Sequence, residues 1–351
     1  MSTTLTIGDL PAPPPGRTGW PWTVGCDPMS ETTPDGRAWP KVTVVTPSYN
    51  QGRFIEETIR SVLLQGYPNL EYLVLDGGSR DETVDVLRKY DRLITHWQSA
   101  KDKGQSDAIN RGLDRATGDW VGWQNSDDCY DAGALRALGE ATARTEPRPP
   151  EGGVDVVYGK VRLIDAESRE TGTYPTGEFD LRSMLPWANM FNQSMFFSRA
   201  VVAEGWRLDA GMCHYIDHDL FWRLILAGKR FAHVRGISAA FRLHGEAKGF
   251  TQHEVAAREL HALYMRLYHE AKLPADIRWL ALKSMRGNCL DQFGKSRWDL
   301  FQTFAGEIVR EAGWRGLGLG LSTRRVFTAI GPRNIDRVRK LTRLLRRRGA
   351  A

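Results

Sequence analysis

Between residues 41 and 124, short apolar runs typical of buried strands alternate with stretches in which apolar residues recur at helical spacing. The predicted strands cover residues 42–46, 70–75, 93–97 and 120–124. The predicted helices between them cover about 55–63, 81–90 and 106–116, and a further helix opens at 131–135. Strand and helix alternate four times, which predicts an α/β fold with a doubly wound, mostly parallel sheet flanked by helices.

The pattern changes after a proline-rich stretch at residues 146–150. One helix, at about 220–227, is expected among short strands at 154–158, 161–164, 171–174, 195–197, 231–234 and 239–243. From about residue 251 the pattern is helical, and the last predicted helix covers about 332–348.

The first 40 residues contain a proline run at 11–15 and little periodicity. Their tryptophans, Trp20, Trp22 and Trp39, indicate that this extension docks on the fold, since free tails seldom carry exposed indoles. The chain is thus expected to consist of an N-terminal extension (1–40), an α/β catalytic domain (41–250) and a C-terminal helical region (251–351).

Polar and glycine residues follow each predicted strand of the first half, at 47–50, 76–79, 101–105 and 125–128. Because the carboxyl ends of parallel strands meet at one edge of a sheet, these residues should gather into a ligand site. The adjacent acids Asp127 and Asp128 repel each other unless a cation or a donor group lies nearby. Mg²⁺ or Mn²⁺, held by carboxylates and phosphate oxygens, would relieve that repulsion. The simpler alternative is an Asx-rich turn that caps the next helix.

Composition places the chain among soluble globular proteins: 41% of its 351 residues are hydrophobic and 26% are charged. No apolar run is long enough to cross a bilayer, and no signal peptide is visible. The widely spaced cysteines are expected to be free thiols in a reducing compartment, so a cytoplasmic location is predicted. They are Cys26, Cys129, Cys213 and Cys289.

The net charge of +6 is concentrated near the C-terminus, where the segment from Arg324 to Arg348 holds ten basic residues and one acid, Asp336. A basic helix of this kind suits an anionic membrane surface at the inner membrane face. The alternative is a solvated helix that packs through its apolar stripe. No nucleic-acid-binding motif accompanies the charge, so a nucleic-acid partner is not expected.

Six ordered motifs between residues 41 and 250 resemble those of family 2 glycosyltransferases, which have the GT-A fold. They are Thr46-Pro47-Ser48-Tyr49-Asn50, Asp76-Gly77-Gly78-Ser79, Gln105 to Gly112, Asn125-Ser126-Asp127-Asp128, Asp217 to Leu224 and Arg242-Leu243-His244. The resemblance implies transfer of a sugar from a nucleotide-diphosphate donor, favourably a UDP-sugar, to an acceptor hydroxyl with inversion. The implied acceptor is a carbohydrate or a lipid-linked molecule in the synthesis of cell-surface polysaccharide or glycolipid.

The resemblance also implies roles for single residues. Pro47 and Tyr49 match positions that hold the nucleoside, and Asp76 matches the acid that reads the base. Asp217 matches the catalytic base. The metal set implied for Mn²⁺ or Mg²⁺ is Asp127, Asp128 and His244. The remaining donor-binding residues expected are Asn50, Gly78, Lys103, Gln105, Asp107, Asn125 and Ser126, of which Asn125 stands where the family pattern has its first acid.

The chemistry of sugar transfer explains why these residue types are needed. The departing nucleoside diphosphate develops negative charge, which a cation on Asp127 and donors such as Lys103 would offset. The acceptor hydroxyl must lose its proton as it attacks, and a nearby carboxylate such as Asp217 can take that proton.

Each role has a structural alternative. Asp217 could cap its helix while Asp219 acts as the base, since side chains two residues apart do not share a helix face. Gln105 and Asp107 could cap and pack their own helix. His244 could be an ordinary core or surface histidine, and Lys103 a solvated lysine.

Two other functions compete with sugar transfer. One is a catalytically silent protein that binds nucleotide sugars for regulation, against which the presence of both Asp127 and Asp217 argues. The other is nucleotidyl transfer on a similar sheet. That reaction usually involves a glycine-rich loop bearing Arg and Lys after the first strand, and residues 46–52 lack such a loop.

Overall fold

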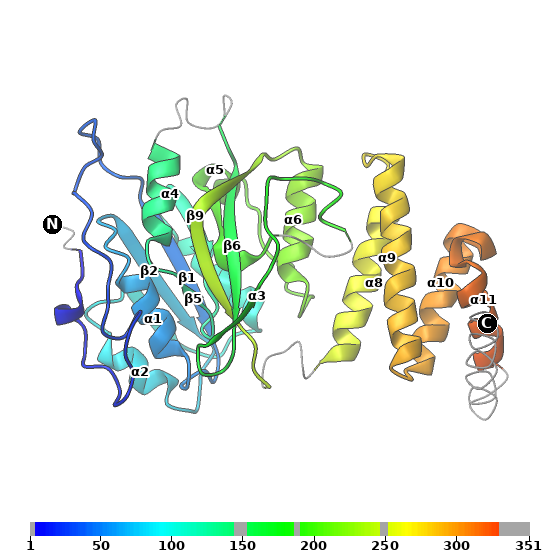
Figure 1. The fold of residues 1–351 in the computed structure, drawn as a ribbon, viewed down its shortest axis with the longest axis horizontal. Helices are drawn as coiled ribbons and strands as arrows, with labels where there is room; N and C mark the ends of the chain where they lie inside the picture. The colour runs from blue at the N-terminus through cyan, green and yellow to red at the C-terminus, as the bar shows by residue number, and fades with distance from the viewer. Residues whose placement is uncertain (1–3, 144–152, 186–189, 246–251, 330–351) are drawn as a thin grey trace, which may run out of the picture. The chain divides into compact units, whose positions relative to one another are not determined.

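The computed structural model describes residues 4–143, 153–185, 190–245 and 252–329. The chain divides into two compact units, one formed by 1–184 with 188–251 and the other by 185–187 with 252–351. The first unit contains the sheet and its flanking helices, and the second contains helices (Figure 1).

A nine-stranded sheet forms the centre of the first unit, in the order β3-β2-β1-β4-β8-β6-β9-β5, with β7 paired to β6. Its first half is parallel throughout, as predicted, and consists of β1 (Val42–Ser48), β2 (Leu70–Asp76), β3 (His96–Ser99) and β4 (Trp120–Trp123). In the second half, β6 and β9 are parallel and the other pairs are antiparallel. Its strands are β5 (Cys129–Tyr130), β6 (Val156–Ile164), β7 (Glu170–Thr173), β8 (Met195–Ser198) and β9 (Phe231–Arg242).

Helices cover both faces of the parallel half. On one face α1 (Ile55–Leu63), α2 (Thr83–Lys89) and α4 (Ala134–Ala143) enclose the main core with Val42 and Val44. On the other face α3 (Gln105–Arg115) lies so close to β1 that a Cβ on Gly112 would come within 2.3 Å of Val45 Cγ1. Glycine at 112 therefore sets the distance between α3 and the sheet. The remaining elements of this unit are η1 (Ile7–Asp9), η2 (Asn192–Ser194), α5 (Arg199–Ala203) and α6 (Ile216–Leu226).

Beyond small differences at strand ends, the structure departs from the predicted strands at three places. Leu93 and Ile94 precede β3 in a turn, and Ile94 is buried there, so their apolar character reflects core packing. Gly159 lies inside β6, at a shift in its register with β9. A Cβ at this position would come within 2.0 Å of the Ile237 carbonyl oxygen, so the glycine allows the close approach of the two strands and does not end β6. The two strands expected at 231–234 and 239–243 form one strand, β9.

The N-terminal extension packs on the first unit, as its tryptophans indicated. Trp22 and Trp39 are buried, and the Trp20 indole N–H donates to the Tyr130 carbonyl at 2.9 Å. The extension therefore adds core to the fold.

Arg60 of α1 anchors this extension from inside the protein. Its guanidinium is fully buried and donates to the carbonyls of Pro11, Pro21 and Trp22 at 2.8–3.0 Å. It also donates to the Tyr90 hydroxyl at 2.9 Å. Because an unpaired buried guanidinium would be very costly, these carbonyls fix the path of the extension.

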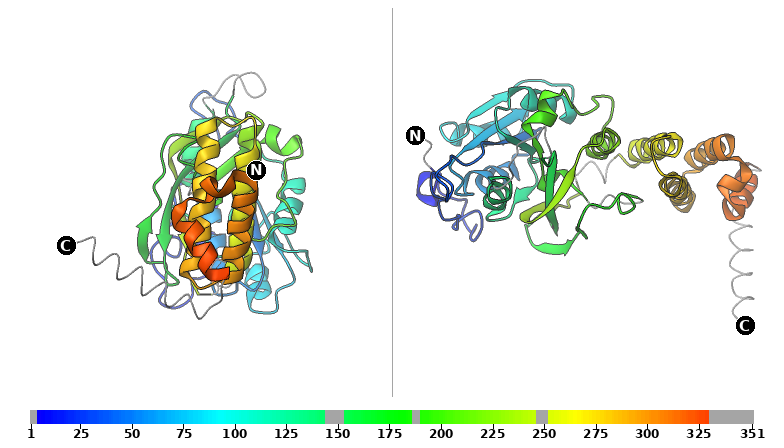
Figure 2. Two further views of the ribbon diagram at one scale, coloured as in Figure 1. Left: turned by 90° about the vertical axis from the view of Figure 1, so that its right-hand side faces the viewer. Right: turned by 90° about the horizontal axis from the view of Figure 1, so that it is seen from above.

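The second unit is an array of four described helices, α8 (His253–His269), α9 (Ala275–Gly294), α10 (Trp298–Leu317) and α11 (Leu319–Ala329). Helices α8 and α9 lie side by side, α10 packs on α9, and α11 packs on α10 (Figures 1 and 2). The helix predicted at 332–348 lies outside the described residues. None of the helices in the described part of the chain combines the length and apolar character needed to span a bilayer.

The four cysteines are all described, and none of them forms a disulfide, as predicted.

Candidate active site

The loops after β1 and β2 are tied together at the carboxyl edge of the sheet. Ser48 and Asp76, the last residues of these strands, are register partners. Beyond them, the Asn50 N–H donates to the Ser79 hydroxyl at 2.7 Å, and the Arg80 N–H donates to Asn50 Oδ1 at 2.9 Å. Asn50 has a φ of +52°, a left-handed conformation that Asn tolerates better than most residues. Asn50 therefore links the two loops.

Asp76 organises the loop that follows it. Its carboxylate is buried and accepts bonds at Oδ2 from the N–H groups of Gly78 (3.1 Å) and Ser79 (2.9 Å) and from the Ser99 hydroxyl (2.6 Å). The Ser79 hydroxyl also donates to Oδ1. The structure thus brings Asp76 and Gly78 together with the end of β3.

The residues expected to hold the nucleoside differ in exposure. Pro47 is buried within β1, whereas Tyr49 is 59% exposed. An aromatic face exposed at a loop of this edge is available for stacking. Lys103 is exposed in the loop that precedes α3.

A chain of amide hydrogen bonds connects α3 to the loop after β4. Gln105 Nε2 donates to Asn125 Oδ1 at 2.8 Å, and Asn125 Nδ2 donates to Asp128 Oδ2 at 3.0 Å. Gln193 Nε2 reaches the same oxygen of Asp128 at 2.9 Å. Ser126 is buried within this loop. Gln105 and Asn125 therefore hold the loop in place.

Asp107 has a local role in this structure. Its carboxylate accepts the Lys103 N–H at 3.1 Å and pairs with Arg111 one turn along the helix at 2.8 Å. These bonds stabilise the first turn of α3, which corresponds to the alternative considered for Asp107.

Asp127 and His244 come together at the centre of the edge, although 117 residues separate them. His244 Nε2 lies 3.0 Å from Asp127 Oδ2, the His244 side chain is 3% exposed, and that of Asp127 is 21% exposed. The His244 ring also packs on Phe54, with centroids 4.6 Å apart. A buried imidazole is thus aimed at a carboxylate that remains partly open to solvent.

Asp128 is fully buried, and both of its oxygens are used inside the protein. Oδ1 accepts the Arg242 N–H at 2.8 Å, and Oδ2 accepts the amides of Asn125 and Gln193. Burial raises the pKa of Asp128 to about 8, and the neighbouring Asp127 carboxylate adds to that increase. The geometry does not support the metal-ligand role expected for Asp128, because its oxygens already support the loop.

Asp127 and His244 have the chemistry of two ligands of a divalent cation. Across the described residues, no group of three or more His, Cys, Asp or Glu side chains is arranged to hold a metal ion. Asp127 and His244 supply one oxygen and one nitrogen at contact distance. Mg²⁺ is often bound by only one or two protein groups, and the phosphates of the substrate supply further ligands.

The two acids at the start of α6 have different surroundings. Asp219 is 2% exposed and pairs with Arg223 Nε at 2.7 Å. Asp217 is 15% exposed, and its Oδ1 accepts the N–H of the next residue, His218. The residue at the N-cap position of α6 is Tyr215, and Asp217 in the first turn satisfies one backbone N–H. Asp217 is therefore the more accessible carboxylate.

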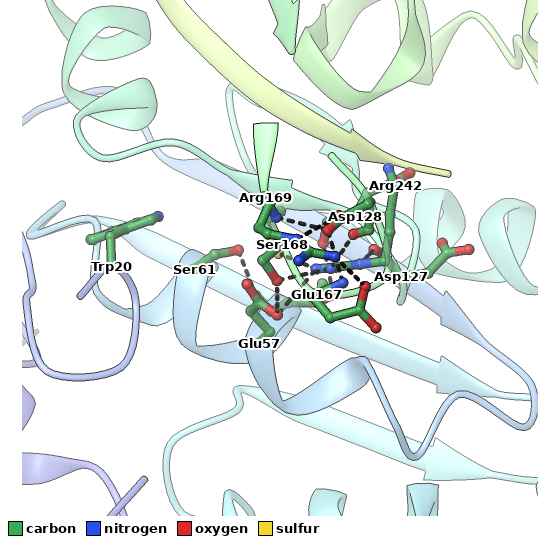
Figure 3. A network of polar contacts seen from close by, with 12 residues as sticks. Trp20, Glu57, Ser61, Asp127, Asp128, Glu167, Ser168, Arg169 and Arg242 are labelled. Atoms are coloured by element: carbon green, nitrogen blue, oxygen red, sulfur yellow. Dashed lines mark hydrogen bonds and ion pairs between the residues drawn. The ribbon is translucent and has the colours of Figure 1, made fainter. Parts of the chain in front are cut away.

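Sequence patterns assigned no supporting role to the residues that stabilise this edge from within, although Arg242 lies in one of the six motifs. Glu57, Ser168, Gln193 and Arg242 all take part in its polar network, shown in part in Figure 3. One available signal was Arg242, a charged residue that follows the apolar run Ala239-Ala240-Phe241 at the end of a buried strand.

Comparison with known proteins identifies the relatives of this chain. The model of the family described as glycosyl transferase family 2 matches residues 43–204. An uncharacterized glycosyltransferase of Mycobacterium tuberculosis is 33% identical over 192 residues, which cover 53% of this chain and 70% of that protein. A PGL/p-HBAD biosynthesis glycosyltransferase of Mycobacterium bovis is 32% identical over 170 residues, or 47% of this chain and 61% of that protein. The chain thus spans less than two thirds of the length of the latter relative.

Solved structures support the GT-A fold assignment. TarS residues 1–349 from S. aureus, crystallised with UDP-GlcNAc, superposes with a TM-score of 0.57 at 16% identity, covering 76% of this chain and 80% of that one. The mannosyltransferase PcManGT from Pyrobaculum calidifontis, crystallised with GDP-Man and Mn²⁺, superposes with a TM-score of 0.52 at 20% identity, covering 88% of this chain and 83% of that one. At these identities the likeness concerns the fold.

The different surroundings of Asp217 and Asp219 predict effects of different size on stability. Asp219→Asn should lower the free energy of unfolding by about 2 kcal/mol, because it removes the charge from a buried, hydrogen-bonded pair. Asp217→Asn should change it by less than about 0.5 kcal/mol. Urea unfolding followed by tryptophan fluorescence measures both values, and equal losses would contradict the assignment.

Proposed function

Because the chain belongs to the family 2 glycosyltransferases, we propose that it transfers a sugar from a nucleotide-diphosphate sugar to an acceptor hydroxyl. The observation that carries the proposal is the Asp127–His244 pair at the carboxyl edge of the parallel strands, next to loops that are held together by Asp76 and Asn50. Ligands of open α/β sheets bind at this edge.

The donor is proposed to be a UDP-sugar whose nucleoside lies against Pro47, Tyr49 and Asp76. The exposed Tyr49 ring offers a stacking surface, and the buried Asp76 carboxylate fixes the loop next to it. A fold neighbour was crystallised with UDP-GlcNAc and another with GDP-Man, which supports the class of donor.

Asp127 and His244 are proposed to hold a divalent cation, Mn²⁺ or Mg²⁺, together with oxygens of the donor diphosphate. When bound, the cation offsets the negative charge that develops on the leaving nucleoside diphosphate. Lys103 is exposed near the start of α3 and would add a mobile positive charge to the same phosphates.

Asp217 is proposed to act as the base. The acceptor hydroxyl loses its proton to the Asp217 carboxylate as its oxygen attacks the anomeric carbon. The bond to the diphosphate breaks on the opposite side, so the configuration inverts. Asp219 is less suited to this role, because Arg223 already occupies its carboxylate.

Replacing Asp127 tests the cation site. Asp127→Ala should abolish Mn²⁺-dependent binding of UDP, because it removes the carboxylate that is accessible to the cation. Isothermal titration calorimetry with UDP, with and without Mn²⁺, gives the two affinities. The control is Asp85→Ala, which removes an acid from an exposed surface ion pair on α2 and should bind like the wild type. Undiminished Mn²⁺-dependent binding in Asp127→Ala would refute this cation site.

Replacing Asp217 tests the chemical step. Asp217→Asn should keep UDP affinity and lose transfer by about two orders of magnitude or more, the usual contribution of a positioned base. Single-turnover transfer from a radiolabelled UDP-sugar provides the rate, once a screen of donors has identified the sugar. Full activity in Asp217→Asn would move the base to Asp219 or elsewhere. Donor binding without any transfer by the wild type would favour the silent binding protein.

The basic C-terminal sequence motivates a proposal about the acceptor. Ten Arg or Lys residues between 324 and 348 suit an anionic membrane surface, where a lipid-linked acceptor or a growing polysaccharide would be available. The protein should therefore co-sediment with phosphatidylglycerol vesicles at low salt and lose that binding as salt screens the charge. Neutral phosphatidylcholine vesicles are the control. Absence of binding to the anionic vesicles would exclude this location.

A further inference from the structure

Arg242 is the last residue of β9 and is completely buried. Its Nε donates to the backbone carbonyl of Asp127 at 2.7 Å, and its own N–H donates to the Asp128 carboxylate at 2.8 Å. One residue therefore bonds both acids of the loop after β4. Two residues further along the chain, His244 contacts the Asp127 side chain.

The other end of the Arg242 side chain is fixed by two separate segments. Nη2 pairs with Glu57 of α1 at 3.1 Å, and Nη1 donates to the Ser168 hydroxyl at 2.9 Å and to the Asp165 carbonyl at 3.1 Å. The guanidinium also lies over the Phe54 ring, 5.0 Å from its centroid. Figure 3 shows Arg242 between Asp128, Ser168 and Glu57.

Ser168 connects these contacts and holds a conformation that is unfavourable for serine. Its hydroxyl donates to Glu57 Oε2 at 2.8 Å while it accepts from Arg242. Its φ is +67°, in the left-handed region that glycine adopts readily. A serine at this turn position thus costs backbone strain and gains two hydrogen bonds to the buried ion pair.

We infer that Arg242 is a positioning residue: clamped by Glu57 and Ser168, it fixes the loop that presents Asp127 to the cation and the donor diphosphate. The inference rests on the proposed function. Arg242 acts through the loop and does not touch the cation or the substrate. The planar guanidinium of Arg242 suits this task, because its five N–H groups donate to several acceptors in fixed directions.

The direction of the contacts favours positioning over simple stabilisation. A buried ion pair is weak support for stability, because apolar residues of similar volume often pack as well or better. Here the Arg242 guanidinium also donates to the backbone carbonyl of Asp127, and the Arg242 backbone N–H donates to the Asp128 carboxylate, so the residue selects one conformation of the loop. Groups that orient a metal-binding side chain typically change metal affinity by about 10- to 100-fold when they are altered.

The test uses variants that loosen the clamp without removing Arg242. Ser168→Gly removes the bridging hydroxyl and relieves the left-handed strain, so stability should be kept while positioning is lost. Glu57→Gln keeps an acceptor oxygen and removes the charge. The control is Ser296→Gly, at a serine with a φ of +61° in the helical unit, where the change relieves similar strain and leaves the clamp residues unaltered.

Two measurements on the full-length protein decide the question. Without any ligand, backbone amide hydrogen exchange of residues 124–130 should be about tenfold faster in Ser168→Gly and Glu57→Gln, because loss of one hydrogen bond to a charged group eases local opening of the loop by about that factor. The affinity for UDP with Mn²⁺ should fall by about tenfold as well. The unfolding midpoint of Ser168→Gly should stay equal to that of the wild type or rise, and Ser296→Gly should change neither exchange of the loop nor affinity.

The outcomes separate the inference from the proposed function. Wild-type exchange in the loop of both variants overturns the positioning role, whatever the protein binds. Faster exchange with unchanged affinity for UDP and Mn²⁺ also overturns it, because the loop would then not set the site. If the wild type binds neither UDP nor Mn²⁺, the proposal for the donor and the cation is refuted. The hydrogen-exchange rates of residues 124–130 still show whether Arg242 fixes the conformation of the loop.

Discussion

The parallel pairing of β1, β2 and β4 is the constraint from which the candidate site follows. Strands that run in one direction must end at one edge, so loops distant in the sequence become neighbours there. Helices cover both faces of these strands, so side chains on the faces lie in the core. Polar side chains are therefore found at the carboxyl edge. The bonds that join Asn50 to Ser79, and Gln105 to Asn125, are consequences of this arrangement.

The candidate site acids divide into two groups by how fully their oxygens are bonded. Asp76, Asp128 and Asp219 are buried, and their oxygens accept hydrogen bonds from nearby donors or an ion pair. A buried carboxylate without such partners would be costly, so these three acids stabilise the loops and helices around them. Asp127 and Asp217 keep partial exposure, which is what a cation or a substrate hydroxyl requires of a carboxylate.

The local sequence pattern predicted the parallel half of the sheet, because alternating strand and helix signals depend on neighbouring residues. It misplaced β3 and divided β6, since the burial of Ile94 and the fit of Gly159 against Ile237 depend on distant packing. For the same reason the acids at 127 and 128 looked equivalent in sequence. Their difference arises from Gln193 and Arg242, and the Arg242–Glu57 pair spans 185 residues. The order of the motifs predicted which loops meet at the carboxyl edge of the sheet. Only the fold distinguished the buried acid Asp128, which stabilises the loop, from the partly exposed Asp127.

The proposed cation site gives a reason for the firm support of the loop that carries Asp127. Within the described residues, Asp127 and His244 are the groups that meet at this point, so the donor phosphates would complete the coordination. On the proposed function, binding of the cation and binding of the donor depend on each other, so an error in the position of the Asp127 carboxylate weakens both. The buried Arg242 guanidinium, which donates to the Asp127 backbone carbonyl, limits that error. This requirement gives a reason for a buried charge pair at a place where apolar residues would pack at lower cost.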